Sequence, residues 1–197
     1  MPAAPCTAYV DESFRRSTDG TGYFLLAAVL VPDERHAAVI AQLREDVASG
    51  QRRWHFRDER HTSRRKFLSA IAELQAINVS ALTYYCQTPS QRKTEQARVR
   101  CLWNLLPALW DHQVNALVIE RREERNDRKD RREIAAAQRD GAADPQLAYS
   151  HGRPKEQPLL WLPDAVVGAI GRNIADNRDE LADLLPDSMR RTEPIDP

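Results

Sequence analysis

Three carboxylates occur at positions where their side chains could share a metal ion. Asp11 ends the apolar run at residues 8–10, and Glu120 ends the apolar run at residues 116–119. Asp164 begins a segment rich in small residues, which could pack closely on a sheet. Carboxylates brought together repel one another unless they are protonated or neutralised by a cation. Oxygen ligands of this kind suit Mg²⁺ or Mn²⁺. We therefore predict that Asp11, Glu120 and Asp164 are metal ligands and catalytic residues for phosphodiester cleavage.

Each of these acids also has a purely structural explanation. Asp11 could begin the turn at residues 15–22, since Asp favours turns. Glu120 could belong to the charged segment that follows it, and Asp164 could offset a helix dipole. These explanations are favoured for each acid taken singly. Two strand-end acids and a helix acid together favour a shared site.

Further side chains could assist such a site. Side chains alternate between the two faces of a strand, so only one of Asp11 and Glu12 can face it. The end of the strand selects Asp11 and leaves Glu12 as an accessory residue. His55 could transfer a proton, because its charge can change near neutral pH. In the charged segment 121–133, Asp127 or Asp130 could fold back as an additional metal ligand; the alternative is a solvated helix.

Residues 51–66 form a basic segment with seven Lys or Arg residues and two acids. Trp54 and Phe56 lie between the charges, and basic residues interleaved with aromatics suit a nucleic-acid backbone and stacked bases. The alternative is a solvated loop with Trp54 inserted into the core. The predicted nucleic-acid-binding residues are Arg52, Arg53, Trp54, Arg57, Arg64 and Arg65.

Composition indicates a folded chain with no strong overall charge. Of its 197 residues, 42% are hydrophobic and 29% are charged, which is typical of a globular domain. Lys plus Arg and Asp plus Glu both number 29, so only local patches can indicate nucleic acid. There is no P-loop, GxGxxG or GxSxG motif, which leaves P-loop nucleotide hydrolysis, dinucleotide chemistry and that type of serine hydrolysis unsupported.

Cysteine usage and hydropathy favour a cytoplasmic protein. Cys6, Cys86 and Cys101 are far apart and form no CxxC pair, which argues against a disulfide framework or a structural zinc site. We expect no signal peptide and no membrane span, because no basic segment is followed by an apolar stretch and no apolar run could cross a bilayer.

The apolar pattern predicts strands alternating with helices. Two opening strands would form a hairpin around the turn at residues 15–22. The expected strands are residues 7–10, 23–31, 79–86, 114–120 and 147–150, with helical segments between them and a closing helix at residues 158–175. This order predicts an α/β fold, a mixed sheet flanked by helices. We expect one domain over residues 1–189 and a disordered tail over residues 190–197.

Five segments together resemble the domain-of-unknown-function family 3800, which has a ribonuclease H-like fold. They are YVDES near the start, YFLLAAVLV, WHFRDER, VNALVIERR and the closing PLLWLPDAVVGAI. The resemblance covers roughly residues 8–175, and YVDES and the closing motif are its more specific parts. It implies a ribonuclease H-like fold, acidic catalytic positions at Asp11, Glu120 and Asp164, and a divalent metal cofactor.

Three functional hypotheses follow. The first is a metal-dependent nuclease that holds one or two Mg²⁺ or Mn²⁺ ions and acts on DNA or RNA. The second is a non-catalytic module of the same fold that binds nucleic acid or a protein partner. The third is a structural oligomer in which the acids are only turns and caps. The sequence does not predict an oligomeric state.

Overall fold

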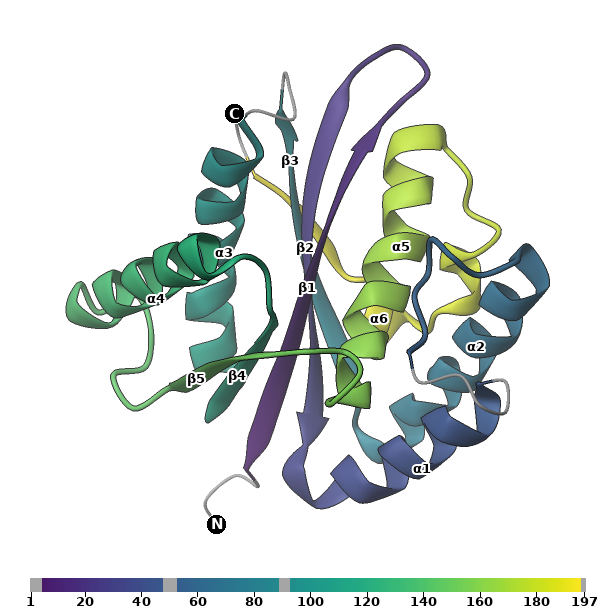
Figure 1. The fold of residues 1–197 in the computed structure, drawn as a ribbon, viewed down its shortest axis with the longest axis horizontal. Coiled ribbons are helices and arrows are strands. Elements are labelled where there is room, and N and C mark those ends of the chain that lie inside the picture. Colours follow the sequence, from purple (N-terminus) through teal and green to yellow (C-terminus); the bar gives the residue numbers. More distant parts are fainter. Residues whose placement is uncertain (1–4, 48–52, 89–92, 196–197) are drawn as a thin grey trace.

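A six-stranded mixed sheet forms the centre of the protein. The computed structural model describes residues 5–47, 53–88 and 93–195. The strand order is β5-β4-β1-β2-β3-β6 (Figure 1). The strands are β1 (Cys6–Arg16), β2 (Gly22–Pro32), β3 (Ser80–Thr88), β4 (Ala116–Glu120), β5 (Ala148–Gly152) and β6 (Thr192–Pro194).

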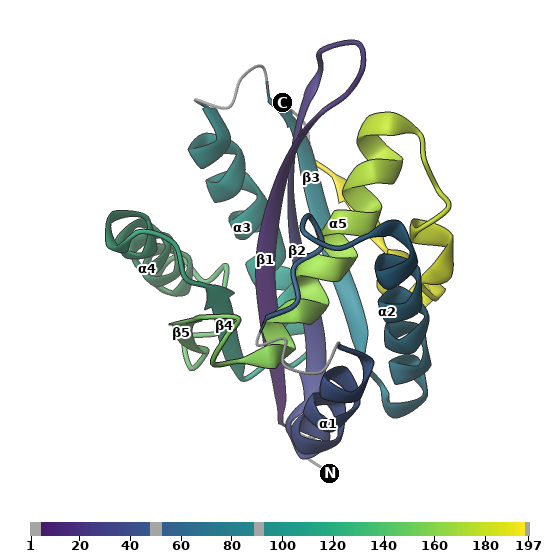
Figure 2. The same cartoon turned by 45° about the vertical axis from the view of Figure 1, so that its right-hand side comes forward.

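Helices cover both faces of this sheet (Figures 1 and 2). One face carries α1 (His36–Asp46), α2 (His61–Glu73), α5 (Trp161–Asp176) and α6 (Asp187–Arg190). The other carries α3 (Thr94–Asp111) and α4 (Glu124–Arg139). Short 3₁₀ helices lie at Asp33–Arg35, Leu74–Ile77, Pro158–Leu160 and Ala182–Leu184. Strand order and helix placement confirm the predicted α/β fold, a mixed sheet flanked by helices. Among the described residues, no helix is long and apolar enough to cross a membrane.

The predicted hairpin of β1 and β2 is confirmed, but β1 is longer than expected. The two strands pair antiparallel from Cys6 opposite Pro32 to Arg16 opposite Gly22. Asp11 therefore lies inside β1 instead of at its end. The strand continues because β2 offers a backbone partner at every position up to the turn, whatever the polarity of the β1 side chains.

The two cores show which face each β1 side chain occupies. Tyr9 belongs to the core under α5, whereas Ala8 and Val10 belong to the core under α3. By alternation Asp11 shares the α5 face with Tyr9, and Glu12 shares the α3 face with Val10. The charged segment 121–133 contributes to α4, whose Ile134 packs into the α3-side core.

The expected disordered tail is wrong in part. Residues 192–194 form β6, which pairs in parallel with β3. Backbone hydrogen bonds flank this pairing, from Thr83 N to Arg191 O (3.1 Å) and from Ile195 N to Tyr85 O (2.8 Å). The open edge of β3 offers unpaired backbone groups that this short segment satisfies. Residues 196–197 lie outside the described part of the chain.

Candidate active site

Asp11 and Glu120 come from neighbouring parallel strands. Val10 of β1 lies opposite Ile119 of β4, and the next residue on each strand is an acid. Val118 packs against the α5-side core, so alternation places Glu120 on the same face as Asp11. β4 ends at Glu120. β1 and β4 are thus neighbours in the sheet, and both carboxylates lie where β1 loses its neighbour on that side.

Asp164 reaches this face from the first turn of α5. Its residue is 8% exposed. One carboxylate oxygen, Oδ2, accepts a hydrogen bond from the backbone N–H of Phe56 (2.8 Å) and lies 3.0 Å from His55 Nδ1. Gly168, one turn later, has no side chain to collide with the ring of Phe56. The small residues of α5 therefore let the loop that carries His55 and Phe56 pack directly on the helix.

The three carboxyl groups act on one another electrostatically. Burial raises the pKa of Asp11 well above its usual range, and the charges of Glu120 and Asp164 raise it further. A hydrogen bond with Glu120 adds to this effect, whereas the charge of Arg98 opposes it. Burial and the charge of Asp164 likewise raise the pKa of Glu120, against the opposing charges of Arg53 and His55. The charged forms of Asp11 and Glu120 are thus disfavoured, and nearby cations offset this only in part.

His55 is a proton-holding side chain beside this group. The hydrogen bond to Asp164 raises the pKa of His55, although burial of the ring opposes the shift. The imidazole remains 31% exposed. His55 contacts Asp164, and its accessory role stays a prediction.

Glu12 points away from the acids, as strand alternation predicted. Its carboxylate forms an ion pair with Arg98 and lies 3.8 Å from Arg122. Arg98 is 3% exposed and binds both oxygens of Asp130, at 2.8 and 2.9 Å. Sequence reasoning missed Arg98. The available signal was a cation on the otherwise apolar face of α3, where a buried charge must have a partner.

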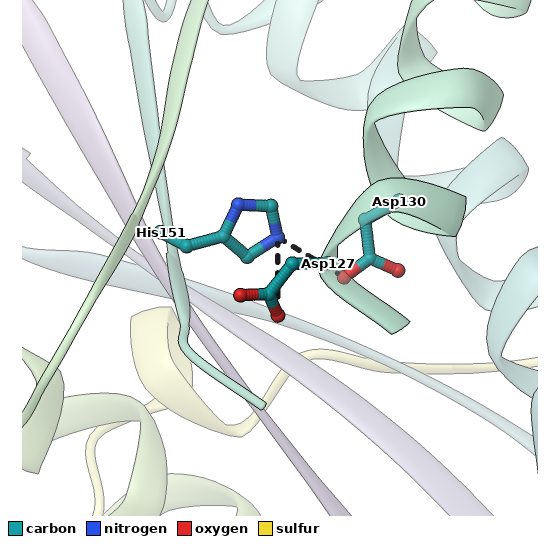
Figure 3. A group of neighbouring side chains, drawn as sticks. All are labelled: Asp127, Asp130 and His151. Atoms are coloured by element: carbon teal, nitrogen blue, oxygen red, sulfur yellow. Dashed lines mark hydrogen bonds and ion pairs between the residues drawn. The ribbon is translucent and has the colours of Figure 1, made fainter. Parts of the chain in front are cut away.

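Asp127 belongs to a different cluster, shown in Figure 3 with Asp130 and His151. His151 Nε2 lies 3.2 Å from Asp130 Oδ2 and 3.8 Å from Asp127 Oδ1. One ligand atom of each residue lies within 4.8 Å of the others, so the group could hold a metal ion. Asp127 Oδ1 also accepts the backbone N–H of Arg122 at 2.9 Å. The structure places Asp127 and Asp130 together on the α3 side with His151, and a role of either as a metal ligand stays a prediction.

Arginines already meet much of the charge in this second cluster. Burial alone would raise the pKa of Asp130, but hydrogen bonds from His151 and Arg98 and the charges of Arg98 and Arg122 lower it strongly. Arg122 also lies 3.0 Å from Asp130. Asp127 Oδ2 is buried without a hydrogen bond, although Arg121 Nε lies 3.7 Å away. Among the described residues, this group and not Asp11, Glu120 and Asp164 has ligand atoms within 4.8 Å of one another.

The basic segment is only partly available to a ligand. Trp54 is 2% exposed, and its ring stacks on Phe67 with centroids 4.1 Å apart. The prediction that Trp54 stacks on bases is therefore wrong, and insertion into the core is confirmed, because the apolar ring completes the packing of α2. Arg64 donates to the carbonyl oxygens of Phe56 (2.7 Å) and Arg57 (3.1 Å). The exposed members of the predicted set are Arg53, Arg57 and Arg65, and Arg52 lies outside the described residues.

No family model and no curated protein matches the chain. It is similar to a crystal structure of Bst-RNase HIII in complex with Mn²⁺, with 13% identity over 84% of this chain and 51% of that chain and a TM-score of 0.49. It is also similar to a structure of a point mutant of Bst-RNase HIII, with 12% identity over 88% of this chain and 56% of that chain and a TM-score of 0.46. The chain thus spans about half the length of these solved structures. TM-scores below one half at such identities assign no chemistry to this chain.

Proposed function

We propose that the protein is a metal-dependent nuclease that hydrolyses phosphodiester bonds in nucleic acid. Asp11, Glu120 and Asp164 would hold one or two divalent ions. The observation that carries this proposal is that carboxyl groups from β1, β4 and α5 lie near one another: Asp11 and Glu120 follow paired positions of parallel strands, and burial together with the charges of Glu120 and Asp164 raises the pKa of Asp11. The donor set consists of carboxylate oxygens, which fits Mg²⁺ or Mn²⁺. A bound ion would lower the pKa of its water and neutralise charge on the phosphate.

The chain's own residues have distinct tasks in this proposal. Asp11 and Glu120 are fixed by the parallel pairing of their strands, so their spacing follows from the sheet. Asp164 is oriented by the N–H of Phe56 and by His55. Because His55 uses Nδ1 for Asp164, its Nε2 is the ring atom that can exchange a proton with the substrate or the leaving oxygen.

The partner and setting of this activity are proposals as well. Exposed Arg53, Arg57 and Arg65 support binding of a nucleic-acid backbone, and we retain Arg52 in that prediction. The resemblance to family 3800 supports the proposal of a metal-dependent nuclease. Cys6, Cys86 and Cys101 are all free, which is consistent with a reducing cytoplasmic compartment.

The decisive test compares Asp11→Asn with Asp140→Asn, a matched change at the exposed end of α4. Purified proteins would be given labelled single- and double-stranded DNA, RNA and an RNA–DNA hybrid with Mn²⁺. We expect Asp11→Asn to lower the cleavage rate by about 1000-fold and Asp140→Asn to leave it unchanged. Undiminished cleavage by Asp11→Asn would refute the assignment. Calorimetric titration with Mn²⁺ separates the alternatives, since absence of binding would favour a non-catalytic module.

A further inference from the structure

Four arginines gather beyond Asp164 on the α5 side of the sheet. Arg15 comes from β1, Arg57 from the loop before α2, Arg64 from α2 and Arg172 from α5. Burial lowers the pKa of Arg15, and the charges of Arg172, Arg57 and Arg64 lower it further, against an opposing effect of Asp176. Burial and the charge of Arg172 also lower the pKa of Arg64. Three separate parts of the sequence, around residues 15, 57–64 and 172, thus place cations close enough to repel one another.

The ring of Phe56 and the backbone of α5 hold this arginine cluster in place. Arg64 Cζ lies 4.7 Å from the ring centroid and Arg15 Cζ lies 5.9 Å from it. Arg15 also donates from a terminal guanidinium nitrogen to the carbonyl oxygen of Gly168 (3.2 Å). Since the N–H of Phe56 binds Asp164, the same loop fixes both the acidic site and the cations. The guanidinium groups are therefore preorganised by neutral groups.

Carboxylates offset the charge of this cluster only in part, since Asp176 acts on Arg15 and Glu59 acts on Arg64 without a close ion pair. Within residues 5–47, 53–88 and 93–195, no ion pair joins Arg15, Arg57 or Arg64 to an acid. Arg172 has one long contact, 3.9 Å, to the half-exposed Glu180. The Nε atoms of Arg15 and Arg172 are buried without a hydrogen-bond partner. Buried donors left unpaired are unfavourable, and an anion would satisfy them.

A cavity joins Arg15 and Arg57 of the cluster to His55 and Asp164. Its volume is about 270 Å³. Its lining includes Arg15, His55, Phe56, Arg57, Asp164 and Gly168. Arg15 lies four residues beyond Asp11 on the same face of β1, roughly 13 Å along the strand. A duplex strand presents one phosphate per ~3.4 Å of helix axis, so the cluster lies a few nucleotides from the carboxylates.

We propose that Arg15, Arg57, Arg64 and Arg172 form a subsite for a phosphate group of the nucleic-acid substrate, a few nucleotides from the bond that is cleaved. Guanidinium groups bind phosphate oxygens through paired, charge-assisted hydrogen bonds, which suits the unpaired donors of this cluster. The inference deepens the proposed nuclease function and rests on it. It adds Arg15 and Arg172, which the sequence pattern of the basic segment did not indicate.

Binding measured without metal tests this subsite separately from cleavage. The probe is a fluorescein-labelled thymidine 15-mer, with either a 5′-hydroxyl or a 5′-phosphate, titrated in EDTA and followed by anisotropy at several salt concentrations. The variants are Arg15→Gln, Arg57→Gln and Arg172→Gln. The control is Arg190→Gln, whose guanidinium already contacts Asp183 and Asp187. Thermal unfolding checks the fold of each variant, and exposed Arg57 keeps the test valid if a buried variant fails to fold.

We expect each subsite variant to weaken binding about tenfold and to reduce the salt slope by about one, with Arg190→Gln unchanged. Equal losses for both probes assign the subsite to an internal phosphodiester, and a loss confined to the 5′-phosphate probe assigns it to a terminal phosphate. The subsite proposal would be overturned if Arg57→Gln, and whichever of Arg15→Gln and Arg172→Gln fold, bound the 15-mer with the affinity and the salt slope of the wild type. The two proposals can fail separately. If these variants lose binding but the wild type cleaves nothing in Mn²⁺, the nuclease proposal is refuted and the phosphate subsite is retained.

Discussion

The carboxyl group of Asp11 occupies surroundings that disfavour its charged form. Burial and the charges of Glu120 and Asp164 raise its pKa, so the metal-free protein folds at neutral pH in spite of this group. A side chain that weakens the fold yet is held in place by a backbone hydrogen bond, from the N–H of Glu12 to Oδ1 (2.7 Å), is typical of a functional site.

Asp11→Asn should therefore stabilise the metal-free protein. The folded-state pKa of Asp11 lies above its unfolded value, so the wild type loses stability as the pH rises from the unfolded pKa through the folded one. Asn stays neutral and can still accept the N–H of Glu12. The increase in the free energy of unfolding should be small near about pH 4 and largest at neutral pH. Urea unfolding with a chelator present measures it. Lower stability of Asp11→Asn at neutral pH would contradict this, and Asp140→Asn should show no such pH dependence.

Arg98 should matter for stability far more than an exposed arginine does. Its side chain is 4% exposed and binds Asp130 and Glu12, so Arg98→Gln removes the buried cation of this network and leaves the two carboxylates to Arg122 alone among the arginines. We expect a loss of about 3 kcal/mol or more in the free energy of unfolding, measured by urea denaturation. Arg128→Gln is the control, because Arg128 is 65% exposed and pairs with Glu124 at the surface. Similar effects of the two changes would show that the buried network contributes little.

Residue types and their positions after apolar runs identified part of the site. Asp11 and Glu120 could be predicted because the acids follow apolar strands, and parallel pairing then makes them neighbours. The position of Trp54 could not be predicted, because an aromatic side chain between arginines can either stack on a nucleic-acid base or pack in the core, as it does on Phe67. The partners of Asp127 and Arg98 lie on other elements, and spacing along one chain does not show such contacts.

At the scale of elements, α5 links the acidic site to the arginine cluster. Its first turn carries Asp164, while Gly168 and Gly171 on later turns leave room for Phe56 and Arg15. In the described structure α5 contacts both β1 and β2. The spacing of these residues along one helix therefore sets the distance between the carboxylates and the proposed phosphate subsite.

The two glycines of α5 should respond differently to alanine. In Gly168→Ala the new methyl group meets the buried ring of Phe56, so we expect a loss of about 1–3 kcal/mol in stability and slower cleavage. In Gly171→Ala the new atom would lie 2.7 Å from Arg15 Nε, at a flexible side chain that can move. Its stability should change little, because alanine favours the helix, while affinity for the 15-mer should fall. Urea denaturation and anisotropy measure the two effects, and equal behaviour of both variants would contradict this account.

Strong local patterns made most elements predictable, and tertiary pairing decided the rest. The apolar run at residues 23–31 identified β2, and the hairpin followed from the glycine-containing turn. The extension of β1 to Arg16 depends on pairing with β2. It could not be predicted, because polar residues such as Glu12 and Arg15 interrupt the apolar pattern of the strand. β6 has three residues and no apolar pattern, so only the open edge of β3 explains it.

At the scale of the whole molecule, the sheet separates two kinds of charge arrangement. On the α5 side, the carboxylates and the arginine cluster lie near each other along β1 and α5, and both lack full compensation. On the α3 side, Glu12, Arg98, Asp130 and His151 compensate one another and join β1, α3, α4 and β5. We infer that the α3 side fixes the scaffold and that the α5 side is available for substrate.

The sheet edge at β6 should affect association of the protein without affecting its chemistry. Ending the chain after Arg191 removes β6 and leaves backbone groups of β3 near Thr83 to Tyr85 unpaired. Such an edge can pair with another chain, so we expect the truncated protein to aggregate at lower concentration, as measured by light scattering. Cleavage per folded molecule should be unchanged, because β2 and β3 separate β6 from β1. Full-length Thr192→Ala, which keeps the backbone of β6, should remain dispersed. This account would be contradicted if the truncated protein aggregated no more than the protein that keeps β6. It would also be contradicted if the truncated protein folded but no longer cleaved.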